Sequence, residues 1–207
     1  MSRKLTTCLA LLVLMPLSCG SFGRLEERGA AAAPDPISFA AWPGRAAPAE
    51  VGAIAAALRE VHTGLLPAEV DHVARVLVRE CERADLSPDL VLAVIRVESS
   101  GYNFARSRAG ALGLMQLLPP TGRAVAHRLG VTWRGRETLF DPGINVRLGI
   151  AYLRELLDRY GDVSTALAAY NWGPSRVSSM LRRGDDAPSV YPRRVLSAFR
   201  EGSARDT

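Results

Sequence analysis

Apolar residues recur at intervals of three and four along most of residues 67–200, which is the spacing of helices that bury one face. The first clear segment covers residues 67–84, and its predicted buried face consists of Val70, Val73, Ala74, Leu77 and Cys81. No run shows the sustained alternation of a strand, although residues 131–133 are a candidate for a short one. The pattern therefore predicts a mostly α-helical domain with little or no β-sheet.

Further helices are delimited by residues that start and stop helices. Ser87 and Pro88 begin a segment that ends at Gly101, and Asp141 with Pro142 begins one of about nineteen residues that ends at Gly161. Shorter helices are predicted over residues 165–170, 174–181 and 190–200. The buried stripe of the long helix is expected to consist of Ile144, Leu148, Ala151, Tyr152 and Leu156.

Glu98 is a charged residue at a position where this pattern calls for an apolar one. It follows Leu90 and Val94 at steps of four, so it ends a stripe that otherwise faces the core. A partly desolvated carboxyl has a raised pKa and retains its proton closer to neutral pH, which is what a general acid requires. The alternatives are a solvated glutamate in the last helical turn or one paired with Arg96 or Arg106.

Glu98 belongs to the first of three sequence blocks that follow one another along the chain. Residues 98–116 contain a Glu-Ser pair, a serine nine positions after the glutamate and a Gly-Leu-Met-Gln that ends eighteen positions after it. The second block is residues 139–149, and the third is the Ala-Ala-Tyr-Asn-Trp-Gly-Pro of residues 168–174. Over roughly residues 85–200, this arrangement resembles the lytic transglycosylases of the soluble type, whose catalytic domain has a lysozyme-like fold related to goose-type lysozyme.

The resemblance implies a reaction on peptidoglycan in which one glutamate acts twice. Glu98 would protonate the glycosidic oxygen between MurNAc and GlcNAc and then, as a carboxylate, accept the proton of the MurNAc C6 hydroxyl. That hydroxyl attacks C1 and leaves a 1,6-anhydroMurNAc end. Glycosidases generally use two carboxylates, but the matched region offers only Glu98, because Asp141 reads as a helix cap and Glu137 as a loop residue.

The same resemblance implies substrate-binding residues around Glu98. Tyr191 belongs to a segment in which Pro192 departs from the family's usual valine. For Met115 and Tyr170 the alternative interpretation is packing in the core. The implied set is Ser107, Gly113, Met115, Gln116, Tyr170, Asn171 and Tyr191.

The N-terminal region indicates export. Residues 1–18 have the basic start and short apolar stretch of a signal peptide, and Cys19 lies where a bacterial lipoprotein would be acylated. Ordinary cleavage between residues 18 and 23 is the alternative. Residues 19–66 read as an Ala- and Pro-rich tether with a possible short helix, residues 67–200 as the lysozyme-like domain and residues 201–207 as a tail. The expected location is the periplasm, with a lipid anchor in the outer rather than the inner membrane.

Composition narrows the alternatives further. The hydrophobic content of 48% and charged content of 23% are those of a globular protein, and the net charge of +5 suits an anionic wall polymer. No nucleic-acid motif, phosphate loop or dinucleotide motif occurs, and His62, His72 and His127 lack metal-ligand spacing, so we expect no cofactor, no metal and no nucleic acid. A hydrolytic muramidase on the same fold and a non-catalytic wall-binding lipoprotein remain the alternative functions, and the oligomeric state is open.

Overall fold

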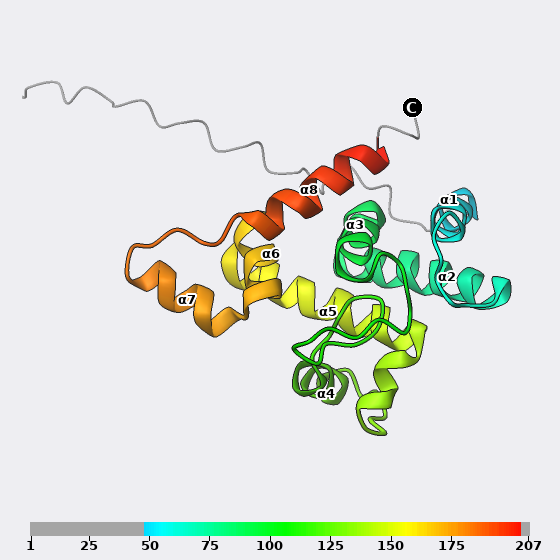
Figure 1. Cartoon of the computed structure of the whole chain (residues 1–207), viewed down its shortest axis with the longest axis horizontal. Coiled ribbons are helices and arrows are strands. Elements are labelled where there is room, and N and C mark those ends of the chain that lie inside the picture. The colour runs from blue at the N-terminus through cyan, green and yellow to red at the C-terminus, as the bar shows by residue number, and fades with distance from the viewer. Residues whose placement is uncertain (1–47, 204–207) are drawn as a thin grey trace, which may run out of the picture. The chain divides into compact units, whose positions relative to one another are not determined.

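The computed structural model describes residues 48–203, and it confirms the mostly helical fold (Figure 1). Within these residues only isolated β-bridges occur, two of which join Leu112 to Arg106 and to Leu117. The helices in chain order are α1 (Pro48–Arg59), α2 (Pro67–Ala84), α3 (Pro88–Ser99), α4 (Pro119–Arg128), the 3₁₀ helix η2 (Arg136–Phe140), α5 (Pro142–Tyr160), α6 (Val163–Trp172), α7 (Pro174–Arg182) and α8 (Val190–Ser203).

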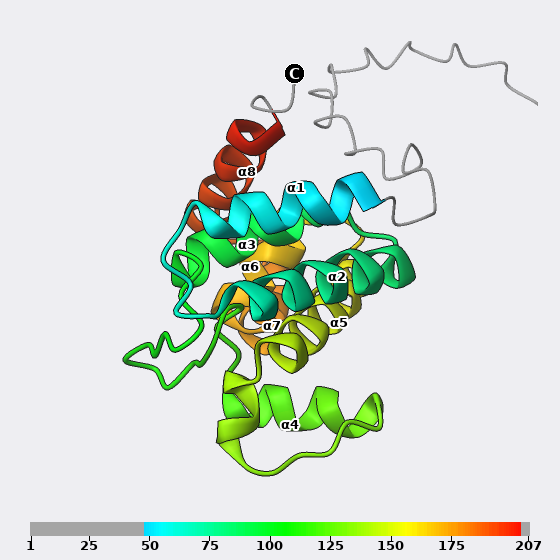
Figure 2. The same ribbon diagram turned by 90° about the vertical axis from the view of Figure 1, so that its right-hand side faces the viewer.

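Helix α5 is the centre of the domain. It packs against α2, α4, η2 and α6, and Figure 2 shows α1, α2 and α5 as successive layers with α4 beyond them. Leu148 and Leu156 are buried as predicted, whereas Ile144, Ala151 and Tyr152 pack against the core but are only partly buried. Because neighbours cover α5 on several sides, its buried surface is wider than one stripe and includes Val146, Gly149, Ile150, Leu153 and Leu157.

The ends of the long helices follow the predicted capping chemistry. The Ser87 hydroxyl accepts a hydrogen bond from the Leu90 amide at 3.4 Å, and the Asp141 carboxylate accepts one from the Ile144 amide at 2.9 Å. Gly161 ends α5. The face of α2 is buried as predicted, with Val73, Ala74, Leu77 and Cys81 fully inaccessible.

Helix α1 extends the helical domain beyond its predicted start. The sequence suggested that residues 19–66 were a tether with a possible short helix, but Ile54, Ala55 and Leu58 are buried in the core and α1 packs against α2. The domain therefore begins no later than Pro48. The predicted signal peptide and Cys19 lie outside the described residues. None of the helices in the described range is long and apolar enough to cross a bilayer.

Helix α4 and the 3₁₀ helix η2 were not predicted, and the prediction of a short strand was wrong. Helix α4 begins with two prolines and buries only Gly122, Val125 and Ala126, which is too small an apolar face for the pattern to detect. Residues 131–133 form no strand; instead the Trp133 ring lies against Gly122, where a methyl group would approach it to 3.3 Å.

Candidate active site

Glu98 lies in the last turn of α3, at the wall of a cavity of about 410 Å³. The lining comes from the loop between α3 and α4 and from α4, α5, α6 and α7. We call this space the Glu98 cavity. Its lining residues are Glu98, Ser107, Ala109, Ala111, Gln116, Leu117, Leu118, Thr121, Tyr152, Tyr170, Asn171, Trp172, Gly173 and Pro174.

A tyrosine from the end of the domain holds the Glu98 carboxyl. The Tyr191 hydroxyl donates a hydrogen bond of 2.6 Å to Glu98 Oε1. The contact forms because α8 packs against α3, and the phenol itself is buried. The structure therefore brings together the two predicted site residues that are farthest apart in the sequence.

Burial raises the pKa of Glu98 above its ordinary value, which is the predicted direction. The hydrogen bond from Tyr191 and the positive charge of Arg194 both lower that pKa, but burial is the larger effect. Burial, followed by the nearby Glu98 charge, raises the pKa of Tyr191 far above its ordinary value, so the phenol keeps its proton and remains a donor. The site thus combines a carboxyl with a raised pKa and a neutral hydrogen-bond donor to it.

The Tyr170 side chain lines the Glu98 cavity, but its hydroxyl is committed to the backbone. It donates a hydrogen bond of 2.8 Å to the carbonyl of Met115. Burial raises the pKa of Tyr170 well above its ordinary value, so this phenol also stays neutral. The Tyr152 ring packs against that of Tyr170 with 5.3 Å between centroids. This pair of aromatic residues forms one wall of the cavity.

Met115 and Gly113 are not among the lining residues. The Met115 side chain is 0% exposed and lies against Gly149, where a Cβ atom would collide with its sulfur. Gly113 has a φ of +80°, and a Cβ there would collide with the Asn145 side chain and the Leu139 carbonyl. Both residues thus lie behind the wall, in the positions that core packing would give them.

Asn145 is a buried polar residue that the sequence analysis did not select. Its Oδ1 accepts a hydrogen bond of 2.8 Å from the Met115 amide, and its Nδ2 donates to the carbonyls of Leu112 at 3.0 Å and Leu139 at 2.9 Å. It ties α5 to the loop that carries the cavity wall. Asn145 could have been identified from the sequence, because it is an amide between Ile144 and Val146 in a helix predicted to be buried. It also lies inside the second sequence block.

The loop between α3 and α4 is held by its own side chains. The Ser107 hydroxyl accepts a hydrogen bond of 3.0 Å from the Ala111 amide. The Gln116 Nε2 donates to the carbonyls of Ala105 at 3.1 Å and Gly113 at 2.9 Å. Ser99 donates to the Leu114 carbonyl at 2.8 Å, which fixes the loop to the residue next to Glu98. Ser107 and Gln116 therefore serve the loop and line the cavity at once.

The sequence did not identify two of the aromatic residues that line the cavity. The other carboxylates considered for the reaction do not line it. Tyr152 and Trp172 line the cavity although neither was selected from the sequence. Among the lining residues Glu98 is the only carboxylate, since Asp141 caps α5 and Glu137 forms an exposed ion pair with Arg136. The described part of the chain contains no cluster of three or more His, Cys, Asp or Glu side chains that could hold a metal ion.

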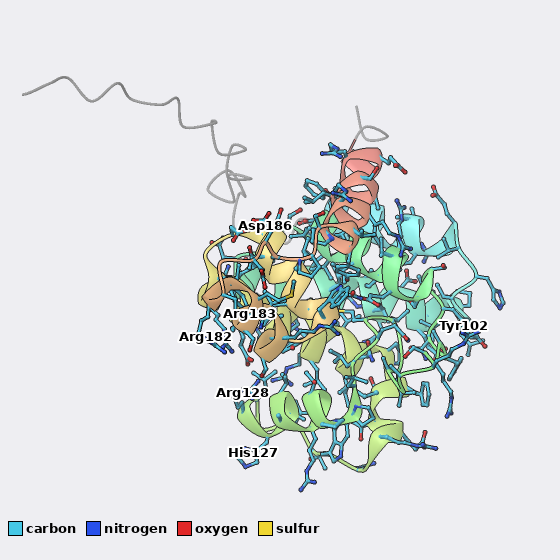
Figure 3. All side chains as sticks on the ribbon, turned by 60° about the vertical axis from the view of Figure 1, so that its left-hand side comes forward. Tyr102, His127, Arg128, Arg182, Arg183 and Asp186 are labelled. Carbon is cyan, nitrogen blue, oxygen red and sulfur yellow. The ribbon has the colours of Figure 1, made fainter. Side chains whose placement is uncertain are left out.

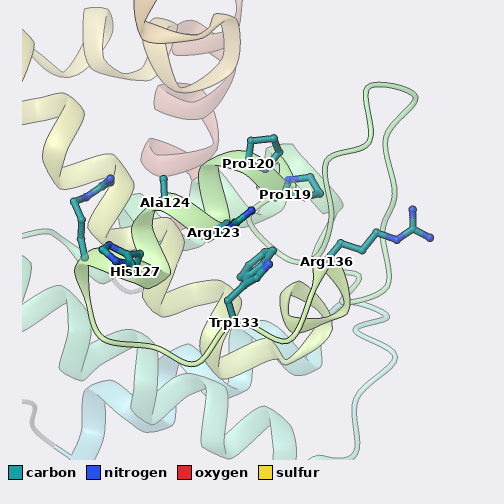
Figure 4. A pocket seen from close by; sticks show the side chains of 8 residues that line it. Pro119, Pro120, Arg123, Ala124, His127, Trp133 and Arg136 are labelled. Atoms are coloured by element: carbon teal, nitrogen blue, oxygen red, sulfur yellow. The ribbon is translucent and has the colours of Figure 1, made fainter.

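A second hollow, of about 690 Å³, lies along α4 and the segment that follows it (Figure 4). Figure 3 shows His127 on the outer side of this helix, whereas Arg128 pairs with Glu155 of α5. No lining residue of this hollow carries a carboxyl group that could donate a proton, whereas Glu98 lines the smaller cavity. The lining residues are Pro119, Pro120, Arg123, Ala124, His127, Arg128, Trp133 and Arg136.

Comparison with known proteins places this chain in a family. Residues 78–189 match the Transglycosylase SLT domain. A transglycosylase of Enterobacteria phage PRD1 is 47% identical over 123 residues, which cover 52% of this chain and 43% of the phage protein. The membrane-bound lytic murein transglycosylase C of Histophilus somni is 31% identical over 153 residues, which cover 63% of this chain and 42% of that protein.

A solved structure shows the same fold. It is an inactive glutamate-to-glutamine mutant of the lytic transglycosylase Slt from Pseudomonas aeruginosa, with a TM-score of 0.56 and 30% identity. The match covers 63% of this chain and 24% of that protein. The chain spans less than half the length of each of these three proteins.

Proposed function

The chain belongs to the Transglycosylase SLT domain family, and we propose that it is a peptidoglycan lytic transglycosylase that cleaves the β-1,4 bond between MurNAc and GlcNAc with formation of 1,6-anhydroMurNAc ends. The observation that carries the proposal is a single cavity carboxyl, Glu98, whose pKa burial raises. The Histophilus somni relative, which is named as a lytic murein transglycosylase, supports the same activity.

In the first step, protonated Glu98 donates its proton to the glycosidic oxygen, and the bond from that oxygen to C1 of MurNAc breaks. The raised pKa favours this donor form. The leaving chain departs as an alcohol, and positive charge develops at C1. Glu98 is then a carboxylate, which the short hydrogen bond from Tyr191 stabilises as the charge appears.

In the second step, the Glu98 carboxylate accepts the proton of the MurNAc C6 hydroxyl while that oxygen bonds to C1. The reaction regenerates protonated Glu98 and consumes no water. One carboxyl suffices because its product in the first step is the base that the second step needs. A hydrolytic muramidase would activate a water molecule instead, and the lack of a second carboxyl among the cavity residues weighs against that alternative.

The remaining predicted residues have supporting roles in this proposal. Ser107, Gln116 and Asn171 offer polar groups to sugar hydroxyls and acetamido groups from the cavity wall. Tyr170 forms an apolar wall for a sugar ring. Gly113 and Met115 act indirectly by allowing the loop to pack closely on α5. A non-catalytic wall-binding protein would have no need for a desolvated acid at this position.

The location remains a proposal based on the sequence and on one named relative. A signal peptide over residues 1–18 and acylation of Cys19 would place the enzyme in the periplasm on a lipid anchor, in the outer membrane. The Histophilus somni relative named as membrane-bound supports such an arrangement.

Product analysis tests the proposed function directly. Purified peptidoglycan is digested with the protein, and the released fragments are analysed by mass. Anhydro ends are lighter than reducing MurNAc ends by one water molecule. We expect anhydro ends, and a digest dominated by reducing ends would replace the transglycosylase with the muramidase.

A further inference from the structure

Trp172 is a large aromatic side chain left partly open to solvent at the wall of the Glu98 cavity. It is the last residue of α6 and is 42% exposed, whereas the residues before it from Ala166 to Tyr170 are buried. The helix could end on a small or polar residue without changing its packing, because the exposed ring contributes little to the core. Exposed aromatic rings in a cavity typically serve as contact surfaces for ligands.

Arg176 fixes the position of this ring. Its guanidinium carbon lies 4.2 Å from the centroid of the Trp172 ring, which is a cation–π contact between the end of α6 and the first turn of α7. Among the described residues no carboxylate forms an ion pair with Arg176. Arg176 is an exposed residue, so a ligand in solvent can reach it.

We propose that Trp172, which lines the Glu98 cavity, and Arg176, which stacks on the Trp172 ring but does not itself line the cavity, form a subsite at its edge that binds a carboxylate-bearing sugar unit of the substrate. The indole packs against the C–H face of the sugar ring, and the guanidinium donates hydrogen bonds to the carboxylate. The proposal rests on the proposed function, because it takes the ligand to be a peptidoglycan strand. It adds a preference for anionic strands that the general reaction does not require.

The chemistry of the pair supports this ligand class. A guanidinium presents two parallel N–H groups that match a carboxylate, and stacking on an aromatic ring leaves those edges free. Trp172 supplies the apolar surface that a sugar ring covers. In peptidoglycan the carboxylate comes from one of two sources, the lactyl group of a peptide-free MurNAc or an acidic residue of a stem peptide. Both present the same group to Arg176.

The competing interpretation is a structural link between α6 and α7. In that case the contact between Trp172 and Arg176 would stabilise the junction of the two helices at Gly173. The affinity for substrate would then not depend on the charge of the substrate. The two interpretations differ in their effects on KM, so kinetics on substrates of different charge separate them.

The experiment compares Trp172→Ala, Trp172→Phe and Arg176→Gln with the matched control Arg75→Gln. Arg75 is an exposed arginine of α2 that does not line the cavity. KM and kcat are measured on peptide-bearing strands and on peptide-free strands, and a neutral GlcNAc oligomer is tested as a competitive inhibitor. Melting temperatures identify any variant that does not fold.

We expect Arg176→Gln to raise KM about fivefold on an anionic strand with kcat within about twofold, because one partly solvated charge-assisted contact is lost. Its inhibition by the neutral oligomer should be unchanged. Trp172→Ala should raise KM about tenfold and weaken inhibition by the oligomer, and Trp172→Phe should retain most of the affinity because it keeps an aromatic face. If KM of Arg176→Gln rises only on peptide-bearing strands, the bound group is the stem-peptide carboxylate. If KM rises on both kinds of strand, the lactyl carboxylate is the bound group in peptide-free strands.

Unchanged KM values in folded Arg176→Gln and Trp172→Ala would overturn the subsite. The subsite would also be overturned if Arg176→Gln weakened binding of the neutral oligomer as much as binding of the anionic strand. The same holds if Arg75→Gln raised KM to the same extent as Arg176→Gln. None of these results bears on the proposed function, which is judged from the wild-type product. If the wild type releases anhydro ends while the variants keep their KM, the subsite fails and the transglycosylase stands.

Discussion

The hydroxyl of Tyr191 lies 2.6 Å from Oε1 of Glu98, across 93 positions of sequence. The bond opposes the effect of burial, because it stabilises the ionised carboxyl that burial disfavours. A carboxyl that must give up a proton and then accept one benefits from both influences. The packing of α8 on α3 is therefore part of the proposed catalytic apparatus as well as of the fold.

Removing the Tyr191 hydroxyl should slow the reaction with little effect on folding. Tyr191→Phe deletes the donor to Glu98, and we expect kcat to fall about ten- to a hundredfold, the usual range for a hydrogen bond to a charged group. Initial rates of wall lysis measure the effect. Tyr160→Phe is the control for loss of a tyrosine hydroxyl that does not contact Glu98, because the Tyr160 hydroxyl bonds to the Pro174 carbonyl and to the Ser178 hydroxyl. Equal rates for both variants would exclude Tyr191 from the mechanism.

The pH dependence should report the raised pKa of Glu98. The first step needs the protonated acid, so activity should fall as pH rises through that pKa. Because the Tyr191 hydrogen bond lowers the pKa of Glu98, the falling limb should move to higher pH in Tyr191→Phe. The measurement is kcat/KM against pH for both proteins. A limb that stays in place, or moves to lower pH, contradicts the assignment of that limb to Glu98.

Asn145 should be important for stability. Asn145→Leu leaves the Met115 amide and the Leu112 and Leu139 carbonyls without their side-chain partner, and we expect a loss of about 3 kcal/mol in the free energy of unfolding. Denaturant unfolding measures it. Asn171→Ala, at an exposed position, should change that free energy by less than about 0.5 kcal/mol. Similar small effects of both substitutions would show that the buried amide does not hold the loop.

The predicted anchor can be tested in cells. If Cys19 is acylated, the mature protein should partition into the detergent phase, and Cys19→Ala should release it to the periplasm or block its processing. Phase separation followed by immunoblotting distinguishes the two forms. The control is the detergent partition of Cys81→Ala, because Cys81 is buried in the folded domain and cannot be acylated there. Identical partition of wild type and Cys19→Ala would favour ordinary cleavage of the signal peptide.

The sequence predicted the helices whose ends carry strong local signals. The Asp141 cap, the prolines of α2 and α3 and Gly161 determine local backbone geometry, so they can be read without tertiary information. Helix α4 and the width of the buried surface of α5 depend on which neighbours cover each face. Ile144, Ala151 and Tyr152 have the right spacing to be buried, but the neighbouring helices cover other faces more completely.

The site was predictable where a residue's chemistry conflicted with its position. Glu98 in an apolar stripe is such a conflict, and its raised pKa agrees with the prediction. Met115 and Gly113 could not be placed, because an apolar side chain or a glycine fits a cavity wall and the core behind it equally well. Tyr152 and Trp172 reach the cavity only through the crossing of α5 and α6, which no local pattern encodes.

The most direct test of the central claim is the Glu98→Gln variant. The amide keeps the shape of the side chain but has no transferable proton, so wall lysis and the release of anhydro ends should be abolished. Burial raises the pKa of Glu98, so ionising it in the folded state costs stability as pH rises through that pKa. The melting temperature of the variant at neutral pH should therefore equal or exceed that of the wild type. A folded Glu98→Gln protein that still releases anhydro ends at a near wild-type rate would contradict the account.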